Sequence, residues 1–428
     1  MRVAHYIQRY PPALGGSEAY FSRLSRYLTE AGDHVTVFTT TAQDLQAFWR
    51  PGGRCLPPGV THEEGGEIRR YAPTLRFRGR RFFLKPLSLV PHRTWQALTL
   101  PCNPISCKMW ADAGRATARF DIVHAAAFPY AWPIACARRL ARTLGVPFVL
   151  TPFLHLGDPE DPKDSTRRAY TQPALLELAR SADRLLVQTE GERKELLRQG
   201  ISAERIILQG MGVDLDDCTG GDRDRARRVW GVGPAEVVVG HLANNSREKG
   251  TVDLLQAAER AWQRGASFRL ILAGPEMPNF LHYWQTYRHA DRVRRLGPLD
   301  AQQKRDFFAG IDGFALPSRS DSFGIVLLEA WANGVPNLAY RAGGIAWVIR
   351  PGKDGLLVRC GDVDELAGAL TRLTTDAALR RALGQAGQER TRQHLWPAKL
   401  QLVRDLYQEL RRPAFFSPIS FASKSRIS

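Results

Sequence analysis

Cysteine is scarce and scattered in this sequence. The six cysteines of the 428-residue chain lie at positions 55, 102, 107, 136, 218 and 360, with no C-x-x-C pair and no histidine partner at metal-ligand spacing. Structural zinc and a disulfide framework are therefore not expected, and reduced thiols fit a cytosolic protein. No apolar run reaches membrane-spanning length, and the start "MRVAHYIQRYPP" has no signal-peptide core. We expect a cytoplasmic protein whose membrane contact, if any, is peripheral.

Acidic residues are missing from a long stretch near the N-terminus. The net charge is +17, and no Asp or Glu occurs from residue 68 to residue 111, where basic and apolar residues are interleaved in "YAPTLRFRGRRFFLKPLSLV". Such a stretch attracts anionic surfaces, whether lipid headgroups, a lipid pyrophosphate or nucleic acid. A solvated basic loop in an arginine-rich protein is the alternative.

The rest of the composition is that of a folded protein with more than one domain. Apolar residues make up 44% and charged residues 24% of the chain. Short apolar runs such as "HVTVFTT" and "FRLILAG" alternate with segments of helical periodicity such as "SEAYFSRLSRYLTEAG". This alternation predicts an α/β fold of two doubly wound, Rossmann-like parallel-sheet domains that face a central cleft.

We place the first domain at residues 1–212 and the second at 213–392. The stretch "GVDLDDCTGGDRDRARRVWGVG" breaks the alternation with glycine and charge, and is interpreted as the interdomain linker. Residues 393–428 are expected to form a helix that packs back on the N-terminal domain, followed by a loose tail.

Two loops that follow predicted strands could hold an anion. In "LGGSE", Gly15 and Gly16 give a tight turn where a phosphate or a sugar can approach bare backbone at a helix start. In "NNSREKG", Arg247 and Lys249 stand before the next helix, where cations and amide dipoles can share a diphosphate. An ordinary turn is the alternative for each loop.

The stretch "PSRSDSFGIVLLEAWANGVP", residues 317–336, combines a polar loop with an apolar helix. The loop residues Ser322, Phe323 and Gly324 would present free N–H groups to a phosphate. A Glu on a buried helix needs partners, and ribose hydroxyls would satisfy Glu329. Helix capping by Asp321 and an internal ion pair of Glu329 are the structural alternatives.

These segments, together with "SADRLLVQTEGERKELLRQGI" and "LILAGPE", resemble the family-4 retaining glycosyltransferases of the GT-B fold (glycosyl transferases group 1) along nearly the whole chain. The stretch "LPSRSDSFGIVLLEAWANGVP" is similar to the family's Glu-x7-Glu element, with Asp321 in place of the first Glu and Glu329 as the second.

The resemblance implies transfer of a sugar from a nucleotide diphosphate donor to an acceptor, with retained anomeric configuration and without a metal or other cofactor. It implies that Glu329 holds the donor ribose and that Asp321 faces the donor hexose. The amides of residues 322–324 and Lys249 would hold the diphosphate, and the Gly15-Gly16 loop would face donor phosphate and acceptor. The leaving phosphate would take the acceptor proton in a same-face attack.

Three positions depart from the family pattern. Asn244 occupies the place of a frequent Arg five residues before Lys249, and Arg247 is the candidate substitute. Trp347 stands where a Glu is frequent after the second Gly pair. Asp321 is one methylene shorter than the family's Glu, which favours a shifted donor-sugar preference.

The family's catalytic histidine after a strand also has no match at its usual position. "TPFLHLGD" offers His155, which we prefer as the catalytic residue, whereas His124 in "DIVHAAA" reads as a packed strand residue. Asp-x-Asp runs at 214–216, 222–224 and 362–364 lie in linker or helix-capping positions, so no metal site is predicted there.

The sequence therefore predicts a glycosyltransferase that uses a nucleotide-sugar donor and a lipid-linked or saccharide acceptor. Residues 68–93 would contact the anionic inner face of the cell membrane, and no nucleic acid is expected as a partner. A nucleotide-sugar epimerase or a sugar phosphorylase on the same fold is the enzymatic alternative. A basic membrane- or nucleic-acid-binding protein is the non-enzymatic alternative.

Overall fold

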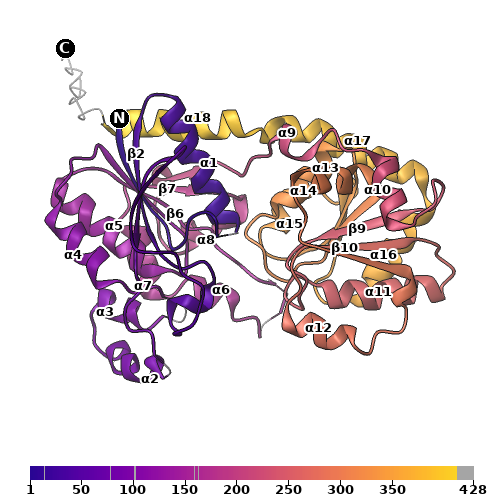
Figure 1. The fold of residues 1–428 in the computed structure, drawn as a ribbon, viewed down its shortest axis with the longest axis horizontal. Coiled ribbons are helices and arrows are strands. Elements are labelled where there is room, and N and C mark those ends of the chain that lie inside the picture. Colours follow the sequence, from indigo (N-terminus) through magenta and orange to yellow (C-terminus); the bar gives the residue numbers. More distant parts are fainter. Residues whose placement is uncertain (14, 78, 101–102, 159, 162, 412–428) are drawn as a thin grey trace, which may run out of the picture.

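A computed structural model describes residues 1–411, except 14, 78, 101–102, 159 and 162. The described chain forms two α/β halves, each with a sheet between layers of helices (Figure 1). The predicted fold class, two Rossmann-like domains, is confirmed. Within the described residues no helix has the length and apolar character needed to cross a membrane.

The N-terminal half contains an eight-stranded sheet with strand order β3-β4-β2-β1-β5-β6-β7-β8. Its neighbouring strands are parallel except for β3 and β4, which pair antiparallel. The strands are β1 (Arg2–Tyr6), β2 (His34–Thr40), β3 (Gly59–Glu63), β4 (Gly66–Tyr71), β5 (Ile122–Ala126), β6 (Phe148–Thr151), β7 (Arg184–Val187) and β8 (Ile206–Leu208).

Helices cover both faces of this sheet because successive strand residues point to opposite sides. Val3 packs with Phe21 and Leu24 of α1, and the next residue, Ala4, belongs to the core on the α5 side. The helices are α1 (Gly16–Glu30), α2 (Arg80–Leu84), α3 (Arg93–Leu98), α4 (Cys107–Arg115), α5 (Ala131–Leu144), α6 (Thr166–Tyr170), α7 (Pro173–Arg180) and α8 (Glu190–Arg198), with 3-10 turns η1 (Leu45–Phe48), η2 (Lys85–Ser88) and η3 (Ala203–Arg205).

The C-terminal half contains a six-stranded parallel sheet with strand order β11-β10-β9-β12-β13-β14. Here too consecutive residues serve opposite faces, since Val238 and Val239 belong to different core clusters. The strands are β9 (Val238–Leu242), β10 (Arg269–Ala273), β11 (Val293–Gly297), β12 (Gly313–Leu316), β13 (Asn337–Tyr340) and β14 (Gly355–Val358).

The helices that follow β8 are α9 (Leu215–Cys218), α10 (Arg223–Trp230), α11 (Thr251–Gln263), α12 (Pro278–Trp284), α13 (Ala301–Gly310), α14 (Ile325–Ala332), α15 (Ile345–Val348), α16 (Val363–Thr375), α17 (Ala377–Thr391) and α18 (Trp396–Arg411), with 3-10 turns η4 (Ala290–Arg292) and η5 (Arg392–His394). The first two, α9 and α10, lie in the stretch that we interpreted as a linker. Asp214, Asp222 and Asp362, the first residues of the three Asp-x-Asp runs, accept backbone N–H groups as N-caps of α9, α10 and α16.

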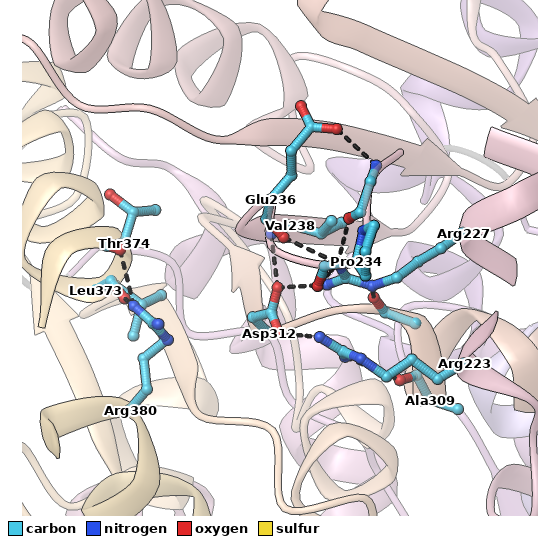
Figure 2. A network of polar contacts seen from close by, with 12 residues as sticks. Arg223, Arg227, Pro234, Glu236, Val238, Ala309, Asp312, Leu373, Thr374 and Arg380 are labelled. Carbon is cyan, nitrogen blue, oxygen red and sulfur yellow. Dashed lines mark hydrogen bonds and ion pairs between the residues drawn. The ribbon is translucent and has the colours of Figure 1, made fainter. Parts of the chain in front are cut away.

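A buried guanidinium fixes α10 and the following turn to the sheet (Figure 2). Arg227 is 3% exposed and donates to the carbonyl oxygens of Gly310, Gly233, Pro234 and Glu236. Its Nη2 also lies 2.7 Å from Oδ2 of Asp312, an oxygen that accepts the amide of Val238 at the start of β9. Nearby, Arg380 of α17 donates to the last carbonyls of α16. These bonds set α13 and β9, and therefore the loops beyond them.

The chain crosses between the halves twice, and the crossing segments pair. Val213 forms a parallel bridge with Leu395 next to the start of α18. From there α18 runs along the N-terminal half (Figure 1), where Arg404 forms an ion pair with Asp33 at 2.9 Å and Tyr407 lies between two buried histidines. The predicted loose tail, residues 412–428, lies outside the described residues.

Candidate active site

A cleft of about 720 Å³ separates the two halves. The loops that line it follow the carboxyl ends of parallel strands, which is where ligands bind in open α/β sheets. Every predicted site residue except Arg247 is in its lining: Gly15, Gly16 and His155 from the N-terminal half, and Lys249, Asp321, Ser322, Phe323, Gly324 and Glu329 from the C-terminal half.

The loop after β1 brings Gly15 against a buried carboxylate. A side chain at Gly15 would place its Cβ 2.3 Å from Oε2 of Glu18, so only glycine fits there without displacing that carboxylate. Glu18 is 2% exposed; its Oε1 forms an ion pair with Arg9 at 2.7 Å and accepts an amide hydrogen of Gln8 at 3.2 Å. Gln8, Arg9 and Glu18 also line the cleft. None of these three was predicted as a site residue, although two polar residues close behind a buried strand were the available signal.

Asp321 connects the two loops of the C-terminal half that were predicted to hold an anion, one with Lys249 and one with residues 322–324. Its Oδ2 lies 2.7 Å from Nζ of Lys249, and its Oδ1 accepts the amides of Phe323 at 3.3 Å and Gly324 at 3.1 Å. Burial by itself would raise the pKa of Asp321, but attraction to Lys249 and these hydrogen bonds hold it below its ordinary value. The expectation that the Phe323 and Gly324 amides are free is therefore wrong for this state, because the Asp carboxylate already uses them.

Other amides at the start of α14 have no such partner. Gly324 is in the left-handed conformation (φ 82°) and turns the chain into the helix. The described residues provide no hydrogen-bond acceptor for the amides of Ile325 and Val326, and both residues line the cleft. The first turn of α14 thus presents N–H groups and the positive end of the helix dipole to the cleft.

Glu329 lies one turn further along α14. It is 9% exposed, and its Oε1 accepts a hydrogen bond from Nζ of Lys304 at 2.6 Å. Lys304 comes from α13 and also lines the cleft. No feature of "AQQKRDFFAG" set this lysine apart, because its pairing with Glu329 depends on how α13 and α14 pack. The cleft lining therefore contains two lysine–carboxylate pairs, one in the loop before α14 and one on α14 itself.

The two histidine candidates have different environments. His155 lines the cleft, with Nδ1 3.2 Å from Oγ of Ser320 and its ring 4.9 Å from that of Tyr170. Burial lowers the pKa of His155 to about 4, against the attraction of Asp321, so the ring is neutral near pH 7. His124 is fully buried between Tyr407 and Thr151, at 2.5 and 2.8 Å, and is outside the cleft lining. Its position in the cleft lining favours His155 as the residue that could contact a substrate.

Arg247 lies away from these groups. It is exposed, its guanidinium carbon is 6.0 Å from the centre of the Tyr283 ring, and it is not among the cleft-lining residues. The structure therefore does not bring Arg247 together with Lys249 and Asp321, and Lys304 is the second cation of the C-terminal half in the lining.

Comparisons with known proteins identify the family that both halves of the chain match. Residues 222–390 match the family model described as glycosyl transferases group 1, and residues 15–212 match the glycosyl transferase 4-like domain. The chain is 27% identical over 422 residues to a D-inositol 3-phosphate glycosyltransferase of Kribbella flavida, covering 92% of this chain and 90% of that protein. It is 28% identical over 419 residues to D-inositol 3-phosphate glycosyltransferase 2 of Catenulispora acidiphila, covering 92% and 90%.

Solved structures of the same fold include proteins with bound nucleotide. Sucrose-phosphate synthase from Thermosynechococcus elongatus superposes with a TM-score of 0.71 at 23% identity, covering 96% of this chain and 98% of that one. Anabaena Alr3699/HepE in complex with UDP superposes with a TM-score of 0.67 at 18% identity, covering 95% and 100%. At these identities the superpositions show the fold alone.

Proposed function

The chain belongs to the group 1 glycosyl transferases, and from this premise we propose that it transfers a sugar from a nucleotide diphosphate donor to a lipid-linked or polysaccharide acceptor with retained anomeric configuration. The observation that carries the proposal is the pair of lysine–carboxylate contacts, Lys249–Asp321 and Lys304–Glu329, around the free amides of α14 in one cleft. A nucleoside diphosphate supplies the anion that such amides and cations bind, and its sugar hydroxyls suit the carboxylates.

In this proposal, donor binding exchanges partners within the cleft. The diphosphate takes the N–H groups at the start of α14 and Nζ of Lys249, which releases one oxygen of Asp321 toward the donor hexose. Ribose hydroxyls donate to the free lone pairs of Glu329, while Lys304 holds that carboxylate in place. In this proposal the donor thus displaces side-chain partners that these groups have within the protein.

The chemical step breaks the bond between the anomeric carbon and the donor phosphate oxygen and forms a bond to an acceptor hydroxyl on the same face. The departing phosphate accepts the acceptor proton, so no protein base has to remove it. Lys249 and the α14 amides stabilise the negative charge that grows on the leaving diphosphate. Because these cationic and N–H groups neutralise the charge, we propose that the reaction needs no metal. Neutral His155 would hydrogen-bond the donor sugar or the acceptor.

The acceptor side of the proposal rests on the N-terminal half. The Gly15-Gly16 loop and Asp321 line the cleft from different halves, and in this proposal the loop offers bare backbone to an acceptor or donor phosphate. The segment 68–93 lacks acidic residues, which supports contact with an anionic membrane that holds a lipid-linked acceptor. Since the similar curated proteins are named D-inositol 3-phosphate glycosyltransferases, a phosphorylated cyclitol belongs among the acceptors to be tried.

Replacing Glu329 tests the donor site. Glu329→Ala should weaken nucleoside diphosphate binding by roughly 10- to 100-fold in isothermal titration, which corresponds to the loss of about one charge-assisted hydrogen bond. The matched control is Glu389→Ala, an exposed carboxylate of α17 that should leave binding unchanged. A thermal-shift panel of nucleotide sugars would first identify the base and sugar. Equal affinity of Glu329→Ala and the parent protein would refute the assignment.

Product analysis tests the reaction. NMR of the transferred sugar should show the donor's anomeric configuration, and transfer should continue in excess EDTA. Inverted product or loss of turnover with the chelator would contradict the corresponding part of the proposal. Conversion of the donor without any acceptor would indicate an epimerase instead.

A further inference from the structure

The segment that follows β4 exposes the most solvent-accessible large apolar side chains of the described chain. Leu89 is 85%, Phe82 80% and Phe83 73% exposed, and Trp95 adds an indole that is 47% exposed. Phe77 lies beside Phe83, with 5.4 Å between the ring centres. We name these five residues the apolar protrusion. Exposed apolar side chains on a protein surface are normally scattered, so this concentration over α2, η2 and α3 indicates an interaction site.

The protrusion is held firmly by the residues beneath it. Ala97 and Leu100, at the end of α3, are buried in the core that α5 and α7 share. Arg80, 4% exposed, donates to the carbonyl oxygens of Phe48 and Asn103 and so fixes the start of α2 to the domain. In Figure 1, α2 and α3 lie at the end of the N-terminal half opposite to α18. The exposed aromatic side chains therefore project from short helices whose inner residues are fixed to the domain.

The structure changes the electrostatic interpretation of this segment. Arg69 is paired with Glu67, Arg70 is buried against Glu63, and Arg76 donates to the carbonyl oxygen of Arg50. Three of the arginines that made the segment look polybasic thus serve the fold. Among the side chains of this segment that the structure describes, Lys85 and Arg93 are exposed cations.

We propose that the apolar protrusion inserts into the headgroup and upper acyl region of an anionic lipid bilayer, with Lys85 and Arg93 at the level of the lipid phosphates. This deepens the proposed function and rests on it, because a lipid-linked acceptor would be reached from that surface. A fluid lipid layer can accommodate apolar side chains carried on these three short elements without a preformed pocket. Acid-free surroundings and apolar tips together are complementary to anionic lipid.

Insertion and simple adsorption predict different responses to mutation. In flotation with vesicles of phosphatidylcholine and phosphatidylglycerol, Phe82→Ser/Phe83→Ser should lower the partition coefficient by roughly tenfold for each ring. Lys85→Gln/Arg93→Gln should lower it by about fivefold for each charge. High salt should reproduce the effect of the charge variant and leave the remaining binding in place. The matched control, Val229→Ser/Leu281→Ser, removes exposed apolar side chains from the C-terminal half and should float like the parent protein.

Three outcomes would overturn the proposal: a parent protein that does not float, a Phe82/Phe83 variant that floats like the parent, or a control variant that loses binding equally. A parent dimer that the Phe82/Phe83 variant dissociates, without vesicle binding, would identify a second copy as the partner and also overturn it. Nucleoside diphosphate titration of the same preparations separates the two proposals. Normal flotation with failed nucleotide binding refutes the proposed function, and the reverse result refutes only membrane insertion.

Discussion

Two arginines that share one carboxylate give a test of how burial controls the strength of an ion pair. Arg227 and Arg223 both contact Asp312, at 2.7 and 2.6 Å, but their side chains are 3% and 43% exposed (Figure 2). Arg227→Met would leave Asp312 with one fewer partner and remove the donor to four carbonyl oxygens. We expect a loss of roughly 3 kcal/mol in the free energy of unfolding. Arg223→Met breaks a pair that water already screens and should cost about 0.5 kcal/mol.

The assay is denaturant unfolding of the parent protein and both variants, with tryptophan fluorescence and circular dichroism as parallel probes. The slope of the unfolding free energy against denaturant should be unchanged, so that the midpoint alone reports stability. Equal losses of unfolding free energy for the two variants would refute the reasoning, because they would mean that the contribution of these contacts to stability does not depend on their burial. A loss confined to Arg227→Met would agree with the structure.

Two further predictions concern the cleft and the response to acid. Gly344→Ala would place a Cβ 1.8 Å from the carbonyl oxygen of Ser322 and should displace the 321–324 loop, so that nucleoside diphosphate binding falls by at least tenfold in titration. The control Gly368→Ala in α16 meets open space and should bind the nucleotide normally. Normal binding by both variants would contradict this account. Burial lowers the pKa of His5 from 6.5 to about 3 and that of His124 well below 6.5. The unfolded chain therefore binds protons that the folded chain does not. The free energy of unfolding should fall by roughly 1.4 kcal/mol per pH unit for each histidine as the pH drops below about 6.5. His124→Gln should reduce this slope when unfolding is measured at several pH values.

Much of the fold followed from local patterns, but some of the first sheet did not. The alternation of apolar runs and amphipathic segments predicted the parallel strands, because a strand buried on both faces leaves a continuous apolar run. The hairpin of β3 and β4 was missed, since every residue of β3 is exposed and the strand has no such run. Its pairing instead depends on the two-residue turn at Glu64-Gly65 and on the edge that β2 offers to β4.

The candidate site divided in the same way. Gly15, Lys249, Asp321 and Glu329 could be selected from the sequence because each belongs to a local motif, and all four line the cleft. Lys304 could not be selected, because it pairs with Glu329, a residue of another helix that is twenty-five positions away in the chain. The free amides of Phe323 and Gly324 were expected from helix geometry alone, and the Asp321 carboxylate that occupies them was treated only as a possible cap.

The sequence by itself determined the alternation of buried parallel strands with helices, the family and the loops that hold the predicted site residues, since these depend on residue types at short spacing. The tertiary structure alone decided which charges are used inside the protein and which remain outside. Arg80 and Phe82 are two residues apart in one basic, apolar segment, yet the first is buried and the second is 80% exposed. Burial is set by what packs against each side chain from distant parts of the chain, and no local pattern contains that information.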